Sequence, residues 1–202
     1  AGDGNYIQFL APGIIGMSII FSSIFNGSSV IWDRQFGFLK ETLVAPVSRL
    51  SIMFGRALGG ATTATFQGII VVLISALIGF KPFSLTLIPV AIIMMFLIAI
   101  LFNSLGIMVA SLLSDMQGFQ LIINFLVMPL FFLSGSFFPL QTAAKPLQVV
   151  AKLDPLSYGI DGLRNLLTGA IGFGLTLDFL VIIIFATAFL SLGSYFFSKI
   201  EV

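Results

Sequence analysis

Five long apolar runs constrain what this chain can fold into more than any other feature. They cover residues 7–31, 57–80, 85–113, 119–138 and 175–197. Each run holds at least 20 residues, and Asp178 is the one charged residue within them. A helix needs about 20 apolar residues to cross the hydrocarbon core of a bilayer. The pattern therefore predicts an all-α, polytopic membrane protein with five spans, folded as a single transmembrane domain over residues 1–202.

The composition supports this fold class and excludes several functions. Of 202 residues, 58% are hydrophobic and 8% are charged, whereas a soluble domain has about 25% charged residues. The net charge of +1 gives no sign of nucleic-acid binding. Cysteine and histidine are both absent, which removes thiol nucleophiles, imidazole bases and the commonest metal ligands. We therefore expect no catalytic, metal or cofactor site in this chain.

The interiors of the spans lack the charges that mark an ion relay. A charge at the bilayer centre costs at least about 2.5 kcal/mol, and we expect Asp178, near the start of its run, to reach the interface. This argues against a proton-coupled carrier, although Na⁺ sites made of carbonyls and hydroxyls stay open.

Amides are the polar groups inside the spans, and we favour hydrogen bonds between helices over substrate contact as their role. The amides are Gln67, Asn103, Gln120 and Asn124. If a pathway for cargo exists, its candidate residues are Gln67, Asn103, Asn124, Phe131 and Phe132.

Two further signals concern helix packing. Gly60, Ala64 and Gly68 are four residues apart and predict a helix face that packs closely on protein. Pro129 lies in the middle of the fourth run and predicts a kink or break there.

A polar stretch at residues 32–56 carries six of the 17 charged residues. Phe36, Leu39 and Leu43 share one helical face, and Pro46 should end that helix by Val44. A helix this short needs a surface to bind. Ser48 is a candidate N-cap for a second helix that runs into the next span. The residues alone are equally compatible with a helix that only lies on the membrane and with one that docks a partner.

The same stretch gives the orientation. Arg34, Lys40, Arg49 and Arg56 lie within it, and Arg49 and Arg56 suit anionic headgroups or an acidic partner. The opposite side has fewer and more scattered cations, so the rule that positive loops are cytoplasmic favours residues 32–56 as cytoplasmic.

The sequence WDRQFGFLKETLVAPVSR, followed by FGRALGG, resembles the first cytoplasmic loop of type-two ABC exporter permeases. Those loops have an acidic-basic pair, a glycine, a short helix bearing leucines, a turn with proline and serine, and a glycine-cation step into the next span. The matching positions are Trp32, Asp33, Arg34, Gly37, Leu39, Leu43, Pro46, Ser48, Gly55 and Arg56. Asp33 stands where the family usually has Glu.

A second polar insert, residues 139–174, resembles the segment between the last two spans of the same family. The matching positions are Ser134, Gly135, Phe138, Pro139, Pro146, Asp154 to Tyr158, and Asp161 to Arg164. By its own pattern the insert predicts two short helices separated at Asp154-Pro155, with Asp161 and Arg164 close enough to pair. A surface loop with two amphipathic helices would also account for its composition.

The resemblance implies the following roles. Residues 32–56 would form a coupling segment that docks a separate ATPase subunit, and residues 139–174 would form short re-entrant helices that gate the outer end. The coupling residues would be Asp33, Arg34, Phe36, Leu39, Lys40, Glu41, Leu43 and Pro46. The outer gate would include Pro139, Asp154, Pro155, Tyr158, Asp161 and Arg164. Such permeases have six spans, so we expect a first span ahead of this sequence.

The leading hypothesis is thus the permease of an ATP-driven exporter, paired as a homodimer in a bacterial or archaeal cell membrane. No G-x-x-x-x-G-K-[ST] phosphate loop occurs, so ATP and Mg²⁺ would be bound by the partner. A charge-free, aromatic-rich interior suits a lipophilic or amphipathic cargo, such as a drug-like compound or a lipid. Alternatives are export of a lipid-linked glycan, a channel or secondary carrier without ATP, and an assembly or receptor subunit that transports nothing.

Overall fold

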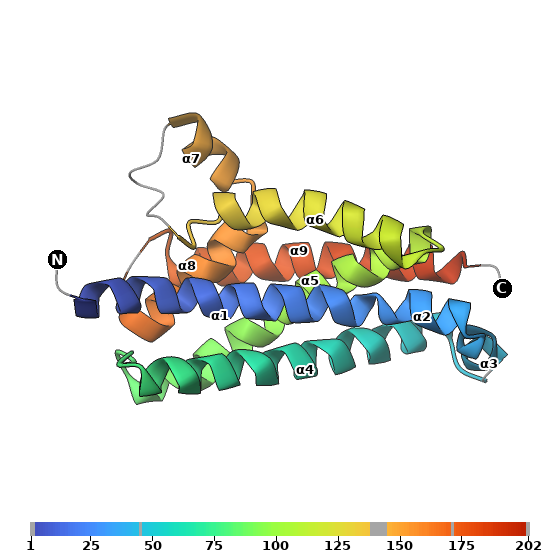
Figure 1. Cartoon of the computed structure of the whole chain (residues 1–202), viewed down its shortest axis with the longest axis horizontal. Coiled ribbons are helices and arrows are strands. Elements are labelled where there is room, and N and C mark those ends of the chain that lie inside the picture. Colours follow the sequence, from blue (N-terminus) through green and yellow to red (C-terminus); the bar gives the residue numbers. More distant parts are fainter. Residues whose placement is uncertain (1–2, 45, 138–144, 171, 201–202) are drawn as a thin grey trace.

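The computed structural model describes residues 3–44, 46–137, 145–170 and 172–200, and gives only the backbone of residues 3–5, Lys40 and Leu43. All regular secondary structure in these ranges is helical. Five helical segments there are long and apolar enough to cross a membrane, which confirms the predicted all-α polytopic fold (Figure 1). They are Tyr6–Gln35, Arg49–Leu77, Leu85–Leu112, Met116–Leu133 and Leu175–Ser198.

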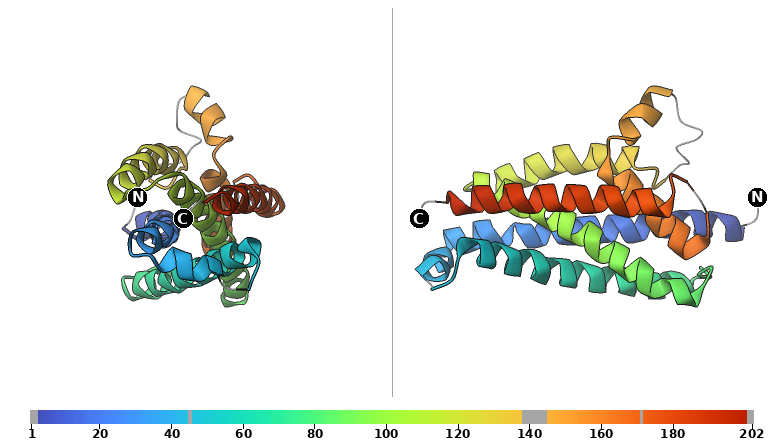
Figure 2. Two further views of the ribbon diagram at one scale, coloured as in Figure 1. Left: turned by 90° about the vertical axis from the view of Figure 1, so that its right-hand side faces the viewer. Right: turned by 180° about the vertical axis from the view of Figure 1, so that it is seen from behind.

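Helix α5 (Ile88–Leu112) forms the centre of the bundle. Its C-terminal part, residues 101–111, is buried except for the half-buried Met108. Three helices pack around it: α1 (Asp3–Gly27), α4 (Arg49–Leu77) and α9 (Leu175–Ser198). The view along the bundle shows α5 between them, with α6 (Met116–Leu133) to one side (Figure 2). The sequence of α5 is apolar around its whole circumference, as expected for a helix enclosed by protein and lipid.

Small residues set the closest helix crossings. A Cβ added at Gly27 would lie 2.6 Å from the Gly106 carbonyl carbon, so the backbones of α1 and α5 touch. On α4, a Cβ at Gly60 would clash with the Asn103 amide and one at Gly68 with Ile19, while Ala64 is fully buried. The prediction that this face of α4 packs on protein is confirmed.

The embedded amides divide into two groups. Asn103 is buried on α5, and its Nδ2 donates to the backbone oxygens of Arg56 (3.1 Å) and Ala57 (2.9 Å) on α4. For Asn103 the predicted hydrogen bond between helices is confirmed. Gln67 on α4, and Gln120 and Asn124 on α6, are exposed at the bundle surface instead.

Some helix boundaries differ from the apolar runs. The second span begins at Arg49 rather than at residue 57, because Ser48 caps it and accepts a hydrogen bond from Ser51 N–H at 3.1 Å. The first run divides near Ser28, where α2 (Ser29–Gln35) follows α1. The fourth helix ends at Leu133. Pro129 lies inside α6, which is unbroken, so the prediction of a break at this proline is wrong. A short 3-10 turn, Leu85–Leu87, leads into α5.

The second polar insert contains two short helices, α7 (Lys145–Ala151) and α8 (Pro155–Thr168), as predicted. Helix α8 is inserted among α1, α5 and α9 at the end of the bundle where the N-terminus lies (Figure 1). Gly169 ends it in the left-handed conformation, with φ of 75°. Pro139 and the residues to 144 lie outside the described ranges.

Asp178 lies in the first turn of α9, and protein buries it. Its side chain is 0% exposed, and neither carboxylate oxygen has a hydrogen-bond partner within the described part of the chain. A Cβ added at Gly162 of α8 would lie 3.3 Å from the Asp178 Cβ, so α8 covers this side chain. The run alone gave no sign of this because the covering helix comes from another segment.

Candidate functional site

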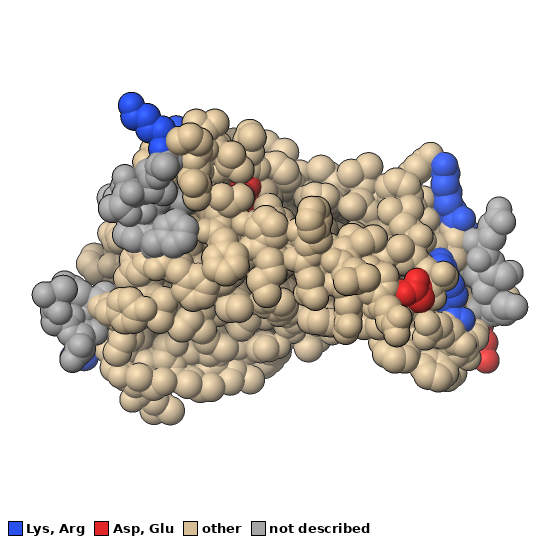
Figure 3. All heavy atoms as spheres, turned by 45° about the horizontal axis from the view of Figure 1, so that its top comes forward, with Lys and Arg blue, Asp and Glu red and all other residues tan. Residues whose placement is uncertain are grey.

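The residues of the polar stretch 32–56 gather at one end of the bundle, where α2 and α3 lie beside the start of α4 and the end of α9 (Figure 1). On the face shown in Figure 3, charged side chains lie at the two ends and an uncharged belt separates them. This distribution is typical of a protein whose middle is surrounded by lipid.

Arg34 ties α2 to the end of the central helix. Its Nη1 donates to the Leu113 carbonyl oxygen at 2.9 Å, and its Nη2 to that of Ser111 at 3.4 Å. These carbonyls lie in the last turn of α5, where intrahelical donors run out and the helix dipole is negative. A guanidinium there supplies both hydrogen bonds and charge.

Two more arginines connect the same region to other spans. Arg56 of α4 forms an ion pair with Asp33 of α2 and also lies near the Ser29 hydroxyl. Arg49, at the start of α4, donates to the carbonyl oxygens of Ser198 and Ile200 at the end of α9. The sequence predicts headgroups or an acidic partner at these two arginines. Arg56 has an acidic partner in Asp33, whereas Arg49 binds backbone carbonyls of the same chain.

Helix α3 (Phe38–Val44) is the short helix predicted before Pro46. It begins two residues later than the pattern indicated, because Gly37 turns the chain with φ of +81° between α2 and α3. Leu39 is fully buried, whereas Phe36, Phe38 and Val44 are 67%, 57% and 85% exposed. Glu41 is exposed as well.

These exposures divide the predicted coupling residues into two sets. Leu39 anchors α3 to the bundle, so its side chain cannot be a docking contact for a partner. The outward face consists of Phe36, Phe38, Glu41 and Val44, of which Phe38 and Val44 were not among the predicted residues. The side chains of Lys40 and Leu43 lie outside what is described, and Pro46 is exposed in the turn before α4.

At the opposite end, the predicted gate residues gather around α8. Asp154 caps α8 by accepting the Leu156 N–H at 2.8 Å, and Pro155 occupies the first helical position. Burial raises the pKa of Asp154 to about 7, against the lowering effect of its hydrogen bonds from Leu156 and Ser157. Tyr158 donates to the Lys152 carbonyl oxygen at 2.9 Å.

Asp161 and Arg164 do not form the direct ion pair that their spacing allowed. Asp161 accepts the Phe173 N–H at 2.7 Å. Arg164 donates to the Gly135 carbonyl oxygen at 3.0 Å, and its guanidinium lies 4.3 Å from the centre of the Phe9 ring. The two side chains connect α8 to three neighbouring segments instead of to each other.

A family model described as ABC-2 type transporter matches residues 2–168. The chain belongs to the ABC-2 type transporter family.

Similar proteins carry permease names. The chain is 32% identical over 165 residues to a putative transport permease ycf38 of Cyanophora paradoxa, covering 81% of this chain and 57% of the relative. It is 31% identical over 186 residues to the inner membrane transport permease YadH of Escherichia coli K12, covering 92% and 72%. Nodulation protein J of Rhizobium leguminosarum bv. trifolii is 28% identical over 170 residues, covering 83% and 64%. The chain thus spans little more than half of the ycf38 relative.

The candidate pathway residues of this ABC-2 chain do not meet within one chain. Asn103 is buried between α4 and α5, and Gln67 lies on the outer surface of α4. Asn124 and Phe132 are exposed on α6, while Phe131 is buried beside Phe137, with ring centres 4.9 Å apart. Of these five residues, only Asn124 and Phe132 are exposed on the same helix.

Sequence reasoning missed the partners of the arginines in this ABC-2 chain. Leu113 and Ser198, whose carbonyls hold Arg34 and Arg49, are 79 and 149 residues away from them. Backbone acceptors leave no trace in the residue types, so no motif could have revealed them. Arginine near the predicted helix ends was the one available signal.

Proposed function

We propose that this chain is the membrane-spanning subunit of an ATP-driven exporter and that a separate ATPase subunit docks on the outward face of α3. The observation that carries the proposal is the contrast within this helix: Leu39 is buried, while Phe38 and Val44 present apolar surface away from the bundle. A seven-residue helix is not stable alone. Its exposed apolar side chains, held on a rigid support, suit a partner protein.

The contacts of α2 supply a route for force. A push on α3 reaches α2 through the Gly37 turn, then α5 through Arg34 and α4 through the Asp33–Arg56 pair. Arg49 extends the same connection to α9. Closure of two ATPases around ATP and Mg²⁺ would therefore move several spans together. The end that carries α3 is then cytoplasmic.

Docking is tested by the double substitution of Phe38→Asp and Val44→Asp. Both side chains are exposed, so the variant should insert and fold normally but lose co-purification with a co-expressed ABC ATPase subunit that the wild type retains. The matched control is Leu153→Asp, which changes an equally exposed leucine at the opposite end. Retention of the ATPase by the double variant at the wild-type level would refute docking on this face.

We also propose that a second copy packs against α6. Leu121, Phe125 and Phe132 are exposed along this helix, and Asn124 lies among them. An amide facing hydrocarbon loses its hydrogen bonds. A second α6, or cargo moving between two copies, would supply partners for it. Supporting this, α6 packs less closely on the other spans than they do on one another, and it lies to one side of the bundle (Figure 2).

The absence of native cysteine makes this interface easy to test. Phe125→Cys should cross-link two copies in the membrane under mild oxidation. Phe66→Cys, at an exposed phenylalanine of α4, should not. Equal cross-linking at both positions, or none at Phe125→Cys, would count against an α6 interface.

For cargo, we propose a lipophilic or amphipathic compound moved outward along the α6 face and released past α8. Export of a lipid-linked glycan is the second candidate, supported by the similarity to a protein named nodulation protein J. Transport into inverted vesicles that depends on both ATP and the ATPase supports either cargo. Flux through vesicles containing this chain alone would favour a channel or secondary carrier.

A further inference from the structure

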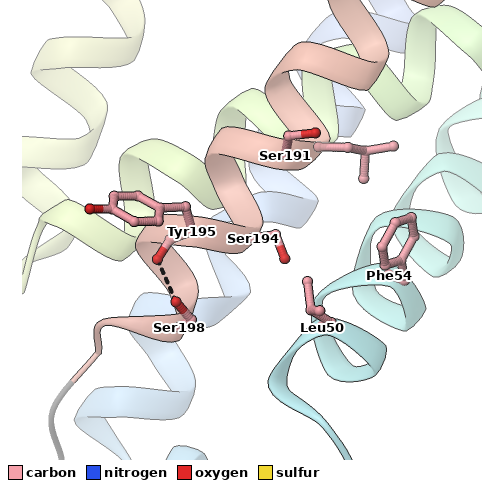
Figure 4. Close-up of a pocket in the computed structure, with 7 residues that line it drawn as sticks. Leu50, Phe54, Ser191, Ser194, Tyr195 and Ser198 are labelled. Atoms are coloured by element: carbon pink, nitrogen blue, oxygen red, sulfur yellow. Dashed lines mark hydrogen bonds between the residues drawn. The ribbon is translucent and has the colours of Figure 1, made fainter.

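A groove lies between the start of α4 and the end of α9, and no residue of α6 or α3 lines it. It has a volume of about 420 Å³. Leu50 and Phe54 line it from α4, and a row of hydroxyl-bearing residues of α9 lines the other side (Figure 4). Ser191, Ser194, Tyr195 and Ser198 form that row, at the spacing of one helical face.

The polarity of the groove changes along its length. Arg49 at the start of α4 and Lys199 at the end of α9 directly adjoin, in the chain, the lining residues Leu50 and Ser198. Leu190 and Phe54 lie deeper. At 1.5 Å per residue, the distance along α9 from Ser198 to Leu190 is about 12 Å. A cationic rim over an apolar interior matches a molecule with an anionic head and a hydrocarbon tail.

One lining side chain lacks a partner. The Ser194 hydroxyl is buried, and no atom in the described part of the chain accepts or donates a hydrogen bond to it. Figure 4 shows it directed across the groove towards Leu50. Ser191 and Ser198 instead donate to Thr187 and Tyr195 carbonyls of their own helix, at 2.8 and 2.7 Å. A buried hydroxyl without a partner is costly, so an acceptor from a bound molecule would stabilise this site.

The cations at the rim keep binding capacity. Arg49 makes both of its carbonyl bonds through Nη1, and a guanidinium has five donors. The Lys199 ammonium lies 4.3 Å from the centre of the Tyr195 ring, a contact that does not neutralise its charge. Both cations are therefore available to the phosphate diester of a lipid headgroup.

We propose that this groove binds an anionic phospholipid, with its phosphate at Arg49 and Lys199, its glycerol region at Ser194, and an acyl chain against Leu50, Phe54 and Leu190. The lipid bridges α4 and α9, which Arg49 already connects. It belongs to the leaflet on the α3 side, and naming that leaflet cytoplasmic rests on the orientation proposed above. Binding itself requires neither the ATPase nor cargo.

The test is native mass spectrometry of the full protein in detergent, titrated with phosphatidylglycerol or phosphatidylcholine. Phosphatidylglycerol should bind with higher affinity. Ser191→Trp fills the groove and should abolish this preference. Leu192→Trp is its control, because Leu192 is the next residue on α9, is exposed, and does not line the groove.

The headgroup contact is tested by Lys199→Gln, which should weaken phosphatidylglycerol binding about fivefold, the usual effect of one cation near an anionic surface. Lys152→Gln, at an exposed lysine on the other end, should leave it unchanged. Equal affinity for both lipids, wild-type binding by Ser191→Trp, or equal loss in Leu192→Trp would each overturn the proposal. So would a Ser191→Cys cross-link between two copies, which would put protein in the groove. None of these results bears on α3, whose docking is measured separately.

Discussion

The two ends of this ABC-2 chain are built by different means. At the α3 end, arginine side chains hold the segment to helix carbonyls and to Asp33, and apolar surface remains exposed on α3. At the α8 end, a whole helix is buried among three spans, and glycines admit its close contacts. The first arrangement leaves a surface free on a segment tied to several spans, whereas the second closes the bundle by packing. This difference suits the proposed roles, in which one end receives a push and the other forms a gate.

The largest effect should come from Leu39→Asp at the α3 end. This residue is fully buried, so a carboxylate there should reduce stability by about 3–5 kcal/mol. Val44→Asp on the same helix should cost almost nothing, because its side chain is 85% exposed. Thermal unfolding of the purified variants in detergent measures both. Similar melting temperatures would show that α3 has no anchored face.

The pH dependence of stability should belong to the α8 end. Burial raises the pKa of Asp154 from 3.8 to about 7. The folded protein therefore holds a proton that the unfolded chain releases, and stability is lost as pH rises from about 4 to about 7. Asp154→Asn keeps the helix cap but does not titrate.

Relative to this variant, the wild type should lose stability on the order of a few kcal/mol across that range. Unfolding at several pH values between 4.5 and 7.5 compares them. Parallel curves for the two proteins would contradict a buried, protonated Asp154.

The smallest effect expected is from the arginines that hold each end. Arg34→Gln removes charged hydrogen bonds to the end of α5, and Arg164→Gln removes the contacts to Gly135 and Phe9. Each should cost about 2 kcal/mol of stability. Transport should separate them: with stability restored by lower temperature, Arg34→Gln should uncouple ATP hydrolysis from transport, while Arg164→Gln should leave the ATPase coupled. Identical transport defects would mean that the ends do not differ in role.

The sequence by itself determined the spans, the end of α3 before Pro46, the Ser48 cap and the two helices of the second insert. These features depend on residues close together in the chain: apolar length, proline geometry and local side-chain caps. The packing face of α4 was also predictable, because small residues at fixed spacing mark it.

Only the tertiary structure decided which side chains face inward. It buried Leu39 and Asp178, gave Arg34 and Arg49 their carbonyl partners, separated Asp161 from Arg164, and left Asn124 outside while enclosing Asn103. In a membrane chain, apolar side chains face lipid and protein alike, so composition does not distinguish the two environments. Contacts between segments far apart in sequence make that distinction, and they exist only once the bundle has formed.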